Sequence, residues 1–257
     1  MRSSPAPSIC AILAAAGVGS RLAGVAGSGP KQFLALGGRP IYQWSLCELA
    51  GHEQVGLVVV ATLSDSISTI QAQIEGLGLT GRTIIIAGGS TRQQSVWLGL
   101  KELSRRQPPP GYVLVHDAAR PFLTREILDA TITVVKEKGA CTTCVPASDT
   151  VKRVQNGQIV ETLDRNSLVL VQTPQAARYD WLRGRRSSVR DGGRQLPGRN
   201  LAMGVKGSVP ELRDHAAARR RGGRGRDPPP PAVPAEGGRH VRPCPPEGPW
   251  AAVQQRW

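Results

Sequence analysis

Short apolar runs alternate with longer amphipathic stretches through the first 177 residues of the chain. The apolar runs have the length of strands, and they lie at 9–13, 55–61, 83–87 and 112–115. The amphipathic stretches have the length of helices, and they lie at 41–49, 66–77, 90–103 and 124–138. Thr124 can cap the last helix through its side-chain oxygen, and Glu126 lies in the first turn, where a negative charge suits the helix dipole.

This alternation predicts the fold class α/β. Nearly continuous apolar runs indicate strands that are covered on both faces, so the pattern predicts a mostly parallel sheet with helices on both faces. Such sheets bind ligands beyond the carboxyl ends of their strands. Polar residues that directly follow a predicted strand are therefore the first candidates for a functional site.

Residues 151–162 depart from the α/β pattern. Two alternating segments flank Asn156-Gly157, a dipeptide that favours a type I′ turn because both positions require positive φ. We therefore expect a protruding β-hairpin arm at about 148–166. An isolated two-stranded ribbon is marginally stable in water, so the arm should pack against another surface, and a second subunit is the natural candidate.

The composition changes after about residue 178, where Arg, Gly and Pro become dominant. Residues 178–257 carry a net charge of +10 out of +14 for the chain, which leaves +4 for residues 1–177. A segment of this composition cannot bury enough apolar surface to offset its ordering entropy, so we expect most of 222–257 to be disordered. We divide the chain into a catalytic domain, 1–177, and a tail, 178–257.

The overall charge alone is typical of a nucleic-acid-binding protein, and RNA binding by the Arg-rich tail is the alternative from another class of function. Residues 1–177 do not support it, because their charge is ordinary and no aromatic stacking platform is visible. No apolar run approaches the ~20 residues that cross a membrane, and the first residues lack the apolar stretch of a secretory signal. We expect a soluble, cytoplasmic protein.

Five scattered cysteines argue against a disulfide framework. Cys141 and Cys144 have the spacing of a metal or redox pair, but no second ligand pair accompanies them and they lie in an apolar run. We interpret them as small apolar core residues.

The first candidate for chemistry is the turn after the first strand, where 14–22 reads AAAGVGSRL. Small residues let the backbone approach a ligand and direct N–H groups at phosphate oxygens. Arg21 and Lys31 add positive charge that could neutralise a triphosphate during phosphoryl attack. The turn has neither the third glycine of the dinucleotide fingerprint nor the GK[ST] of a P-loop. Taken alone, it could also be an ordinary connection between a strand and a helix.

The second candidate is the segment HDAARP at 116–121, which follows another apolar run. Asp117 should lie at the carboxyl end of that strand, where a carboxylate suits a Mg²⁺ ion that bridges nucleotide phosphates. Arg120 could hold a phosphate, although a structural Asp–Arg pair explains the same residues. Because His116 should point to the opposite side of the strand from Asp117, we expect it to have a structural role.

Seven segments occur in the order and at the spacing of one known family: AAAGVGSRL at 14–22, PKQ at 30–32, AGGS at 87–90 with Ser95, HDAARP at 116–121, DTVK at 149–152, DRN at 164–166 and TPQ at 173–175. Over about residues 8–177 the chain resembles the 2-C-methyl-D-erythritol 4-phosphate cytidylyltransferases of the non-mevalonate isoprenoid pathway. The resemblance implies a Rossmann-like nucleotidyltransferase fold and a homodimer in which each hairpin arm embraces the other subunit.

The resemblance also implies a reaction, in which the phosphate of methylerythritol phosphate attacks the α-phosphate of CTP and pyrophosphate leaves. Its implied site divides into residues that stabilise the transition state, residues that bind the nucleotide, a ligand for the cofactor Mg²⁺ and residues that bind the acceptor. The residues that stabilise the transition state are Arg21 and Lys31. The nucleotide is bound by Ala15, Ala16, Gly17, Gly88, Ser95 and Asp117, and Asp117 is also the Mg²⁺ ligand. The acceptor is bound by Arg120, Thr150, Arg165 and Thr173.

Two alternatives stay open for the function. A sister family makes CDP-ribitol from ribitol 5-phosphate and typically has Pro-Val-Arg where this chain has Leu163-Asp164-Arg165, so the sequence favours methylerythritol phosphate as the acceptor. The chain could also be an inactive, truncated homologue that acts as a dimeric scaffold.

The resemblance ends at about residue 177, because the family continues after the TPQ segment with a helix, a last strand that carries a site lysine, and a closing helix. Our hypothesis is a shift of reading frame after about Asp180, which would turn GC-rich coding sequence into Arg, Gly, Pro and Ala. Lys206 matches two conflicting alignments and stays unassigned. If the last strand and helix are missing, one sheet edge should lie bare, with lower stability and weak or absent turnover.

Overall fold

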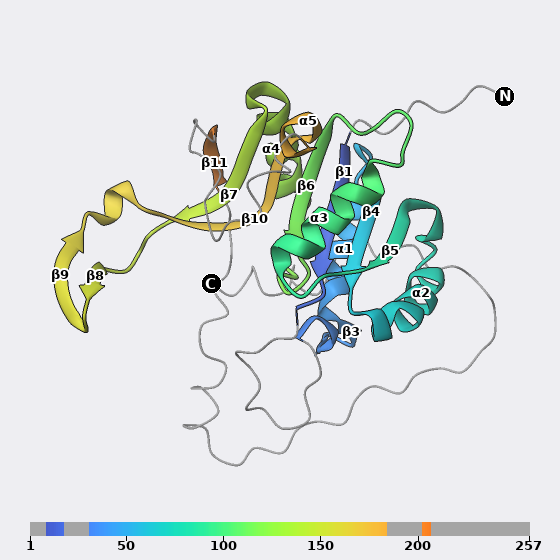
Figure 1. Ribbon diagram of the computed structural model, residues 1–257, viewed down its shortest axis with the longest axis horizontal. Coiled ribbons are helices and arrows are strands. Elements are labelled where there is room, and N and C mark those ends of the chain that lie inside the picture. The colour runs from blue at the N-terminus through green and yellow to red at the C-terminus, as the bar shows by residue number, and fades with distance from the viewer. Residues whose placement is uncertain (1–8, 18–30, 184–201, 207–257) are drawn as a thin grey trace, which may run out of the picture.

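A seven-stranded mixed sheet in the order β11-β7-β10-β6-β1-β4-β5 runs through the centre of the protein (Figure 1). The computed structural model describes residues 9–17, 31–183 and 202–206. β10 runs antiparallel to both of its neighbours, whereas β1 runs parallel to β4 and β6, β4 to β5, and β11 to β7. The bounds are β1 Ile9–Ala15, β4 Val55–Thr62, β5 Thr83–Ala87, β6 Tyr112–Asp117, β7 Ala140–Pro146, β10 Val169–Arg178 and β11 Ala202–Lys206. The predicted α/β class with a mostly parallel sheet is confirmed.

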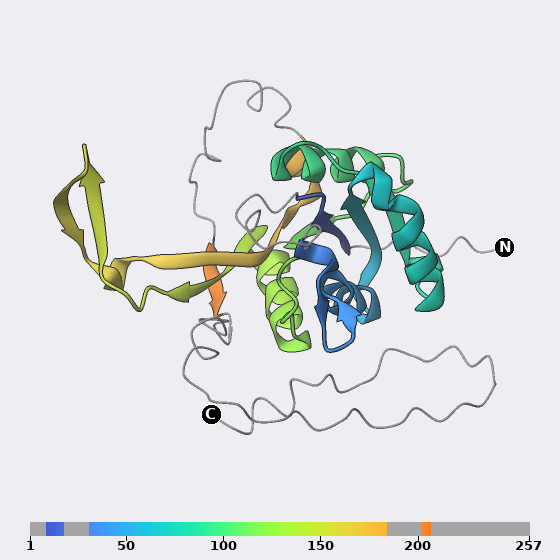
Figure 2. The same cartoon turned by 90° about the horizontal axis from the view of Figure 1, so that it is seen from below.

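Helices cover the sheet on both faces, as the apolar runs predicted (Figure 2). Alternate residues of β1 serve the two faces: Leu13 packs in the core that α1, α2 and α4 cover, and Ile12 packs in the core under α3 and α5. An added Cβ at Gly99 would lie 2.9 Å from Ile12, so this glycine lets α3 approach β1 closely. The bounds are α1 Ile41–Gly51, α2 Ile67–Gly76, α3 Arg92–Leu103, α4 Arg125–Lys138 and α5 Tyr179–Arg183.

The start of α4 has the predicted cap. The Thr124 side chain accepts a hydrogen bond from the Ile127 N–H at 3.4 Å. A hydrogen bond from Thr124 and one from its own backbone lower the pKa of Glu126, so its carboxylate is charged at the positive end of the helix. Thr91 caps α3 in the same way by accepting from the Gln94 N–H at 3.1 Å.

The hairpin arm forms as predicted and stands away from the sheet (Figures 1 and 2). Strands β8 (Val151–Gln155) and β9 (Gln158–Leu163) pair with each other as a separate two-stranded sheet. Asn156 and Gly157 have φ of 51° and 78°, the left-handed values that a type I′ turn requires. Short elements complete the fold: the hairpin β2 (Ala35–Leu36) with β3 (Arg39–Pro40), and the 3-10 turns η2 (Lys31–Phe33), η3 (Ser64–Ser66), η4 (Thr80–Arg82) and η5 (Arg165–Ser167).

The sheet edge beside β7 is paired. β11 comes from the segment that the sequence assigned to the tail, and it pairs with β7 through Ala202 opposite Cys141 and Lys206 opposite Cys144. The bare edge that a missing last strand would leave is therefore not present. The predicted disorder of 222–257 lies outside the described residues.

Cys141 and Cys144 are core residues, which confirms the interpretation of their spacing. Both lie on β7 as buried, free thiols. Burial raises the pKa of the Cys141 thiol to about 11, so it is protonated and unreactive at neutral pH.

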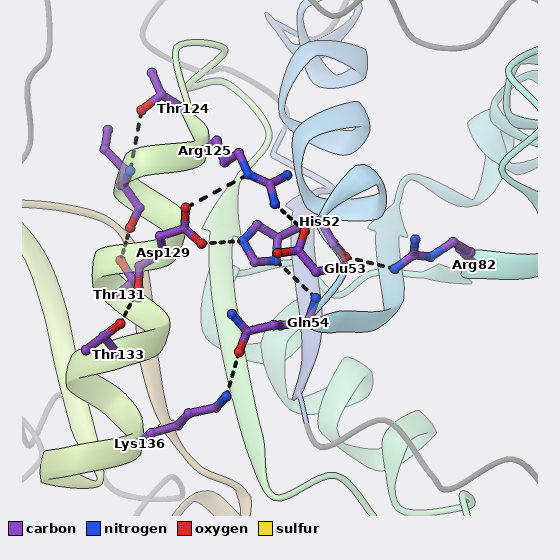
Figure 3. A network of polar contacts seen from close by, with 11 residues as sticks. His52, Glu53, Gln54, Arg82, Thr124, Arg125, Asp129, Thr131, Thr133 and Lys136 are labelled. Carbon is purple, nitrogen blue, oxygen red and sulfur yellow. Dashed lines mark hydrogen bonds and ion pairs between the residues drawn. The ribbon is translucent and has the colours of Figure 1, made fainter.

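A polar network joins the end of α1 and the start of β4 to side chains of α4 that point toward them, at the amino ends of the parallel strands (Figure 3). His52 is buried, its Nδ1 accepts the Gln54 N–H at 3.2 Å, and its Nε2 lies 3.0 Å from the Asp129 carboxylate. Arg125 forms ion pairs with Glu53 and Asp129. We call His52, Glu53, Gln54, Arg82, Arg125, Asp129 and Lys136 the amino-edge network.

Among the described residues, no helix has both the length and the apolar character needed to cross a membrane.

Candidate functional site

A pocket of about 260 Å³ opens at the carboxyl ends of the parallel strands, where the fold class places a ligand. Its walls come from the end of β1, from η2, from the loop and first turn that join β5 to α3, and from the end of β6. The lining residues are Ala14, Ala16, Gly17, Gln32, Gly89, Ser90, Thr91, Arg92, Ser95, Asp117 and Ala119.

The loop between β5 and α3 is held tightly against β1 and β4. The Gly88 N–H donates to the Thr62 carbonyl at 2.7 Å, and an added Cβ at Gly88 would lie 2.4 Å from the Ala16 Cβ. Ser95 is buried, and its hydroxyl accepts from the Gly89 N–H at 3.0 Å and donates to the Thr91 carbonyl at 3.0 Å. In this structure, Ser95 lines the pocket and its hydroxyl also fixes the shape of the loop.

Gln32 anchors η2 to the pocket floor. Its side chain is 3% exposed, and the amide nitrogen donates to the Ala15 carbonyl at 2.6 Å. This bond joins residues 17 positions apart and fixes the backbone that carries Lys31 beside the end of β1. Of Lys31 itself the structure describes the backbone alone.

Asp117 lies at the centre of the charged part of the pocket. Arg92 donates through Nε to Asp117 Oδ1 at 2.6 Å, and Arg120 Nε lies 3.6 Å from Asp117 Oδ2. A terminal nitrogen of Arg92 also donates to Gln175 on β10 at 3.3 Å. Two guanidinium groups therefore face one carboxylate, and this corner of the pocket carries an excess of one positive charge.

A buried chain of hydrogen bonds links the backbone of Asp117 to Thr173, His116 and the Arg120 carbonyl. The Asp117 N–H donates to the Thr173 hydroxyl at 3.2 Å, so the hydroxyl hydrogen is free to donate to His116 Nδ1 at 3.1 Å. His116 Nε2 then carries the proton that is donated to the Arg120 carbonyl at 3.0 Å. Burial lowers the pKa of His116 to about 4, which keeps the ring neutral at neutral pH. The expected structural role of His116 fits this geometry.

The predicted site residues fall into three groups. Ala16, Gly17, Ser95 and Asp117 line the pocket. Four others lie directly beside that lining through contacts described above: Ala15, Gly88, Arg120 and Thr173.

Lys31 lies next to Gln32 of the lining, with only its backbone described, and two further predicted residues lie away from the pocket. Thr150 and Arg165 are exposed on the arm, where Arg165 donates to the Ser148 carbonyl at 3.3 Å. Arg21 lies outside the described residues.

Arg92 and Gln32 had no predicted role. The Arg92 signal was present in the sequence, because this residue follows a predicted strand and a Gly-Gly-Ser-Thr turn at the start of a predicted helix. Its partner Asp117 is 25 positions away, and only the packing of α3 beside β6 shows that the two meet.

Comparison with known proteins identifies the family of this site. The family model described as IspD: 2-C-methyl-D-erythritol 4-phosphate cytidylyltransferase matches residues 9–197. The enzyme of that name from Salinibacter ruber is 37% identical over 182 residues, which cover 70% of this chain and 74% of that protein. The bifunctional enzyme IspD/IspF from Rhodopseudomonas palustris strain HaA2 is 38% identical over 188 residues, and the match spans 72% of this chain but only 45% of that protein.

Solved structures give the same result. The crystal structure of 4-diphosphocytidyl-2C-methyl-D-erythritol synthase from Anaerococcus prevotii has a TM-score of 0.59 and 26% identity, over 68% of this chain and 73% of that chain. The 2-C-methyl-D-erythritol 4-phosphate cytidylyltransferase from Thermus thermophilus has a TM-score of 0.56 and 27% identity, over 74% of this chain and 80% of that chain. The fold is therefore that of the nucleotidyltransferases that the resemblance implied, and the chain belongs to the 2-C-methyl-D-erythritol 4-phosphate cytidylyltransferase family.

Proposed function

We propose that this chain transfers the cytidylyl group of CTP to 2-C-methyl-D-erythritol 4-phosphate and releases pyrophosphate, as a cytoplasmic enzyme. The observation that carries the proposal is the pocket at the carboxyl ends of β1 and β6. It combines small residues, exposed backbone and an excess of guanidinium charge, in a chain that belongs to the family.

The residues of the pocket support a mechanism of positioning and charge neutralisation. An oxygen of the acceptor phosphate attacks the α-phosphorus of CTP, the new P–O bond forms, and the bond to the pyrophosphate oxygen breaks. The nucleophile belongs to the substrate, so the enzyme has no need of a covalent intermediate. Arg21 and Lys31 stabilise the negative charge on the crowded phosphorus in this proposal, and the bond from Gln32 to Ala15 holds the backbone of Lys31 in place.

The nucleotide lies against the ends of β1 and β5 in this proposal. Ala15, Ala16 and Gly17 present backbone groups to it, and Gly88 lets the loop after β5 lie close to Ala16, because an added Cβ there would lie 2.4 Å from the Ala16 Cβ. Ser95 holds the loop that forms the opposite wall. Backbone donors and acceptors can distinguish cytosine from uracil, which differ in their pattern of hydrogen bonding.

Asp117 is suited to hold a Mg²⁺ ion. It is the only carboxylate that lines the pocket among the described residues. Mg²⁺ usually takes one or two carboxylates and completes its coordination with substrate phosphates and water, so a single aspartate beside a triphosphate is sufficient. The bound ion would neutralise phosphate charge and orient the leaving group.

The acceptor phosphate is assigned to Arg120 and Thr173 beside Asp117, together with Thr150 and Arg165 from the arm of a second subunit. The arm supports this homodimer because it pairs with nothing else in the described chain and exposes apolar side chains. Val154 and Ile159 lie opposite each other on the hairpin and are 59% and 66% exposed. Val169, Leu170 and Val171 at the start of β10 are also exposed apolar residues. Burial against an identical chain would remove this surface from water.

The test of the reaction is pyrophosphate release by the full chain with CTP and Mg²⁺, with methylerythritol phosphate and ribitol 5-phosphate as rival acceptors. We expect turnover with the first acceptor, and its loss in Arg21→Ala, Lys31→Ala and Asp117→Asn. Arg105→Gln is the matched control, because Arg105 forms an exposed ion pair with Glu102 beyond the far end of α3. Preference for ribitol 5-phosphate would assign the chain to the sister activity, and no release with either acceptor would identify an inactive homologue.

The homodimer is tested by sedimentation of Ile159→Lys, which places a charge in the apolar surface of the arm. We expect the dimer to dissociate to monomers. Gln158→Lys adds the same charge at an exposed polar position of the same hairpin and should leave the dimer intact. A wild-type chain that sediments as a monomer at micromolar concentration would contradict the proposal.

A further inference from the structure

The Asp117 carboxylate already has a cationic partner on each oxygen. Arg92 Nε lies 2.6 Å from Oδ1, and Arg120 Nε lies 3.6 Å from Oδ2. A divalent cation that uses Asp117 must therefore compete with a guanidinium group, and above all with the short, charge-assisted bond from Arg92. This competition arises because the proposed metal ligand, Asp117, is bonded to the same arginines that form the proposed phosphate-binding surface.

Arg92 is able to leave Asp117 without losing every partner. Its side chain is 45% exposed, and it is held by one bond to Asp117 and one to Gln175. A guanidinium group has five N–H donors, so three remain for another anion. Arg92 also opens α3 and lines the pocket, where the aligned N–H groups of the first helical turn favour negative charge. A triphosphate in the pocket would thus give Arg92 an alternative partner within reach.

We propose that Arg92 is a positioning residue that occupies Asp117 in the nucleotide-free enzyme and exchanges the carboxylate for phosphate oxygens when the metal–nucleotide complex binds. The proposal rests on the proposed function and deepens it. A metal ion that binds alone must break the Arg92–Asp117 bond, and Arg92 gains no new anionic partner. When the metal ion binds with the nucleotide, the phosphates become the new partner of the Arg92 guanidinium. Binding of the two is therefore coupled through Arg92, and Asp117 does not collect free divalent cations.

The test measures binding of Mn²⁺ alone, as a paramagnetic substitute for Mg²⁺, by the EPR signal of the free ion. We expect weak binding to the wild-type chain and about tenfold tighter binding to Arg92→Gln, since the competing charge is removed. The double variant Arg92→Gln/Asp117→Asn should lose the whole gain, which would place the bound ion at Asp117. Arg105→Gln, which removes an arginine at the far end of α3, should bind Mn²⁺ as the wild type does.

A second measurement determines the affinity of the chain for CTP in the presence of EDTA, which removes divalent cations. Arg92→Gln should bind metal-free CTP about tenfold more weakly, because the guanidinium that receives the phosphates is absent. A merely structural role for Arg92 would lower both affinities, whereas the proposal requires them to move in opposite directions. Unchanged or weaker Mn²⁺ binding to Arg92→Gln would overturn it.

These measurements are independent of turnover. A chain that releases pyrophosphate normally but shows no gain in Mn²⁺ affinity would refute the exchange and leave the proposed function intact. A chain without turnover that still shows the opposite shifts would refute the function and leave the exchange at Asp117 established.

Discussion

The two edges of the sheet each hold a buried histidine in a polar network, yet the two networks differ in whether charged groups remain available to a ligand. At the amino edge, His52 contacts Asp129, and Arg125 forms ion pairs with both Glu53 and Asp129. At the carboxyl edge, His116 is linked to Thr173 and the Arg120 backbone, while two arginines share Asp117 beside a pocket. The polar groups of the amino-edge network bond to one another. The cluster around Asp117 retains an excess of positive charge beside the pocket.

The difference shows why a cluster of potential metal ligands is a poor guide to function by itself. Ligand atoms of His52, Glu53 and Asp129 lie within 4.8 Å of one another, which is close enough to share an ion. His52 Nδ1 accepts from the Gln54 N–H, however, so its Nε2 carries a proton and donates it to Asp129. The amino-edge network therefore ties α4 to the start of β4, whereas the pocket lies at the opposite edge.

The largest effect should come from a side chain at Gly88. In Gly88→Val, the Cβ would meet the Ala16 Cβ at 2.4 Å and the Thr62 carbonyl at 3.3 Å, so the loop must move and the pocket must change shape. We expect loss of measurable pyrophosphate release, because small displacements of catalytic groups have large kinetic effects.

Gly51→Ala is the matched control at the amino edge, where an added Cβ meets nothing within 4 Å. It should retain wild-type activity. Normal turnover by Gly88→Val would show that the loop tolerates displacement and would remove the distinction between the two edges.

The next effect concerns the pH dependence of stability at His116. Its pKa is about 4 in the folded protein and 6.5 in the unfolded chain, so the ring is neutral in both states above pH 6.5. As the pH falls from 6.5 to 4, His116 becomes protonated in the unfolded chain but stays mostly neutral in the folded protein. The free energy of unfolding should decrease by up to about 3 kcal/mol over this interval.

In His116→Gln this contribution is absent. Urea unfolding at pH 7.5 and pH 4.5 should show a smaller decrease for the variant than for the wild type, since all other groups titrate in both proteins. The variant should be less stable at pH 7.5, because glutamine does not reproduce both ring hydrogen bonds. Identical pH profiles would mean that His116 is accessible to protons in the folded protein.

The smallest effect should come from the amino edge. Asp129→Asn keeps an oxygen that can accept from His52 Nε2 and removes only the charge of a half-exposed group. We expect kcat/KM within about twofold of wild type and a change in Tm below about 3 °C, since exposed ion pairs contribute little. Calorimetric titration with Zn²⁺ should show the same binding with and without Asp129. A stoichiometric site lost in the variant would instead make this network a metal centre.

Local signals in the sequence predicted most of the fold. The Asn156-Gly157 turn, the Thr124 cap and the apolar runs of the strands each depend on neighbours a few residues away, and all are confirmed. The position of Asp117 at a strand end followed in the same way.

What the sequence did not predict depends on contacts between distant segments. The Arg92–Asp117 pair and the Gln32–Ala15 bond need α3 and η2 in place beside the strands before they exist. β11 pairs with β7 although its residues lie in a segment whose composition is typical of disorder. No local pattern distinguishes an arginine that meets only solvent from Arg92, which meets a carboxylate at the end of a distant strand.

β10 begins beside the hairpin arm and ends in the central sheet, and it carries Thr173, which accepts a hydrogen bond from the Asp117 N–H. The support of Asp117 consequently lies on the strand that directly follows the arm. A chimaera that exchanges arms between relatives must choose its junctions with this in mind. A graft that ends within β10 before Thr173 preserves the host's support of Asp117, whereas a longer graft replaces that support together with the arm.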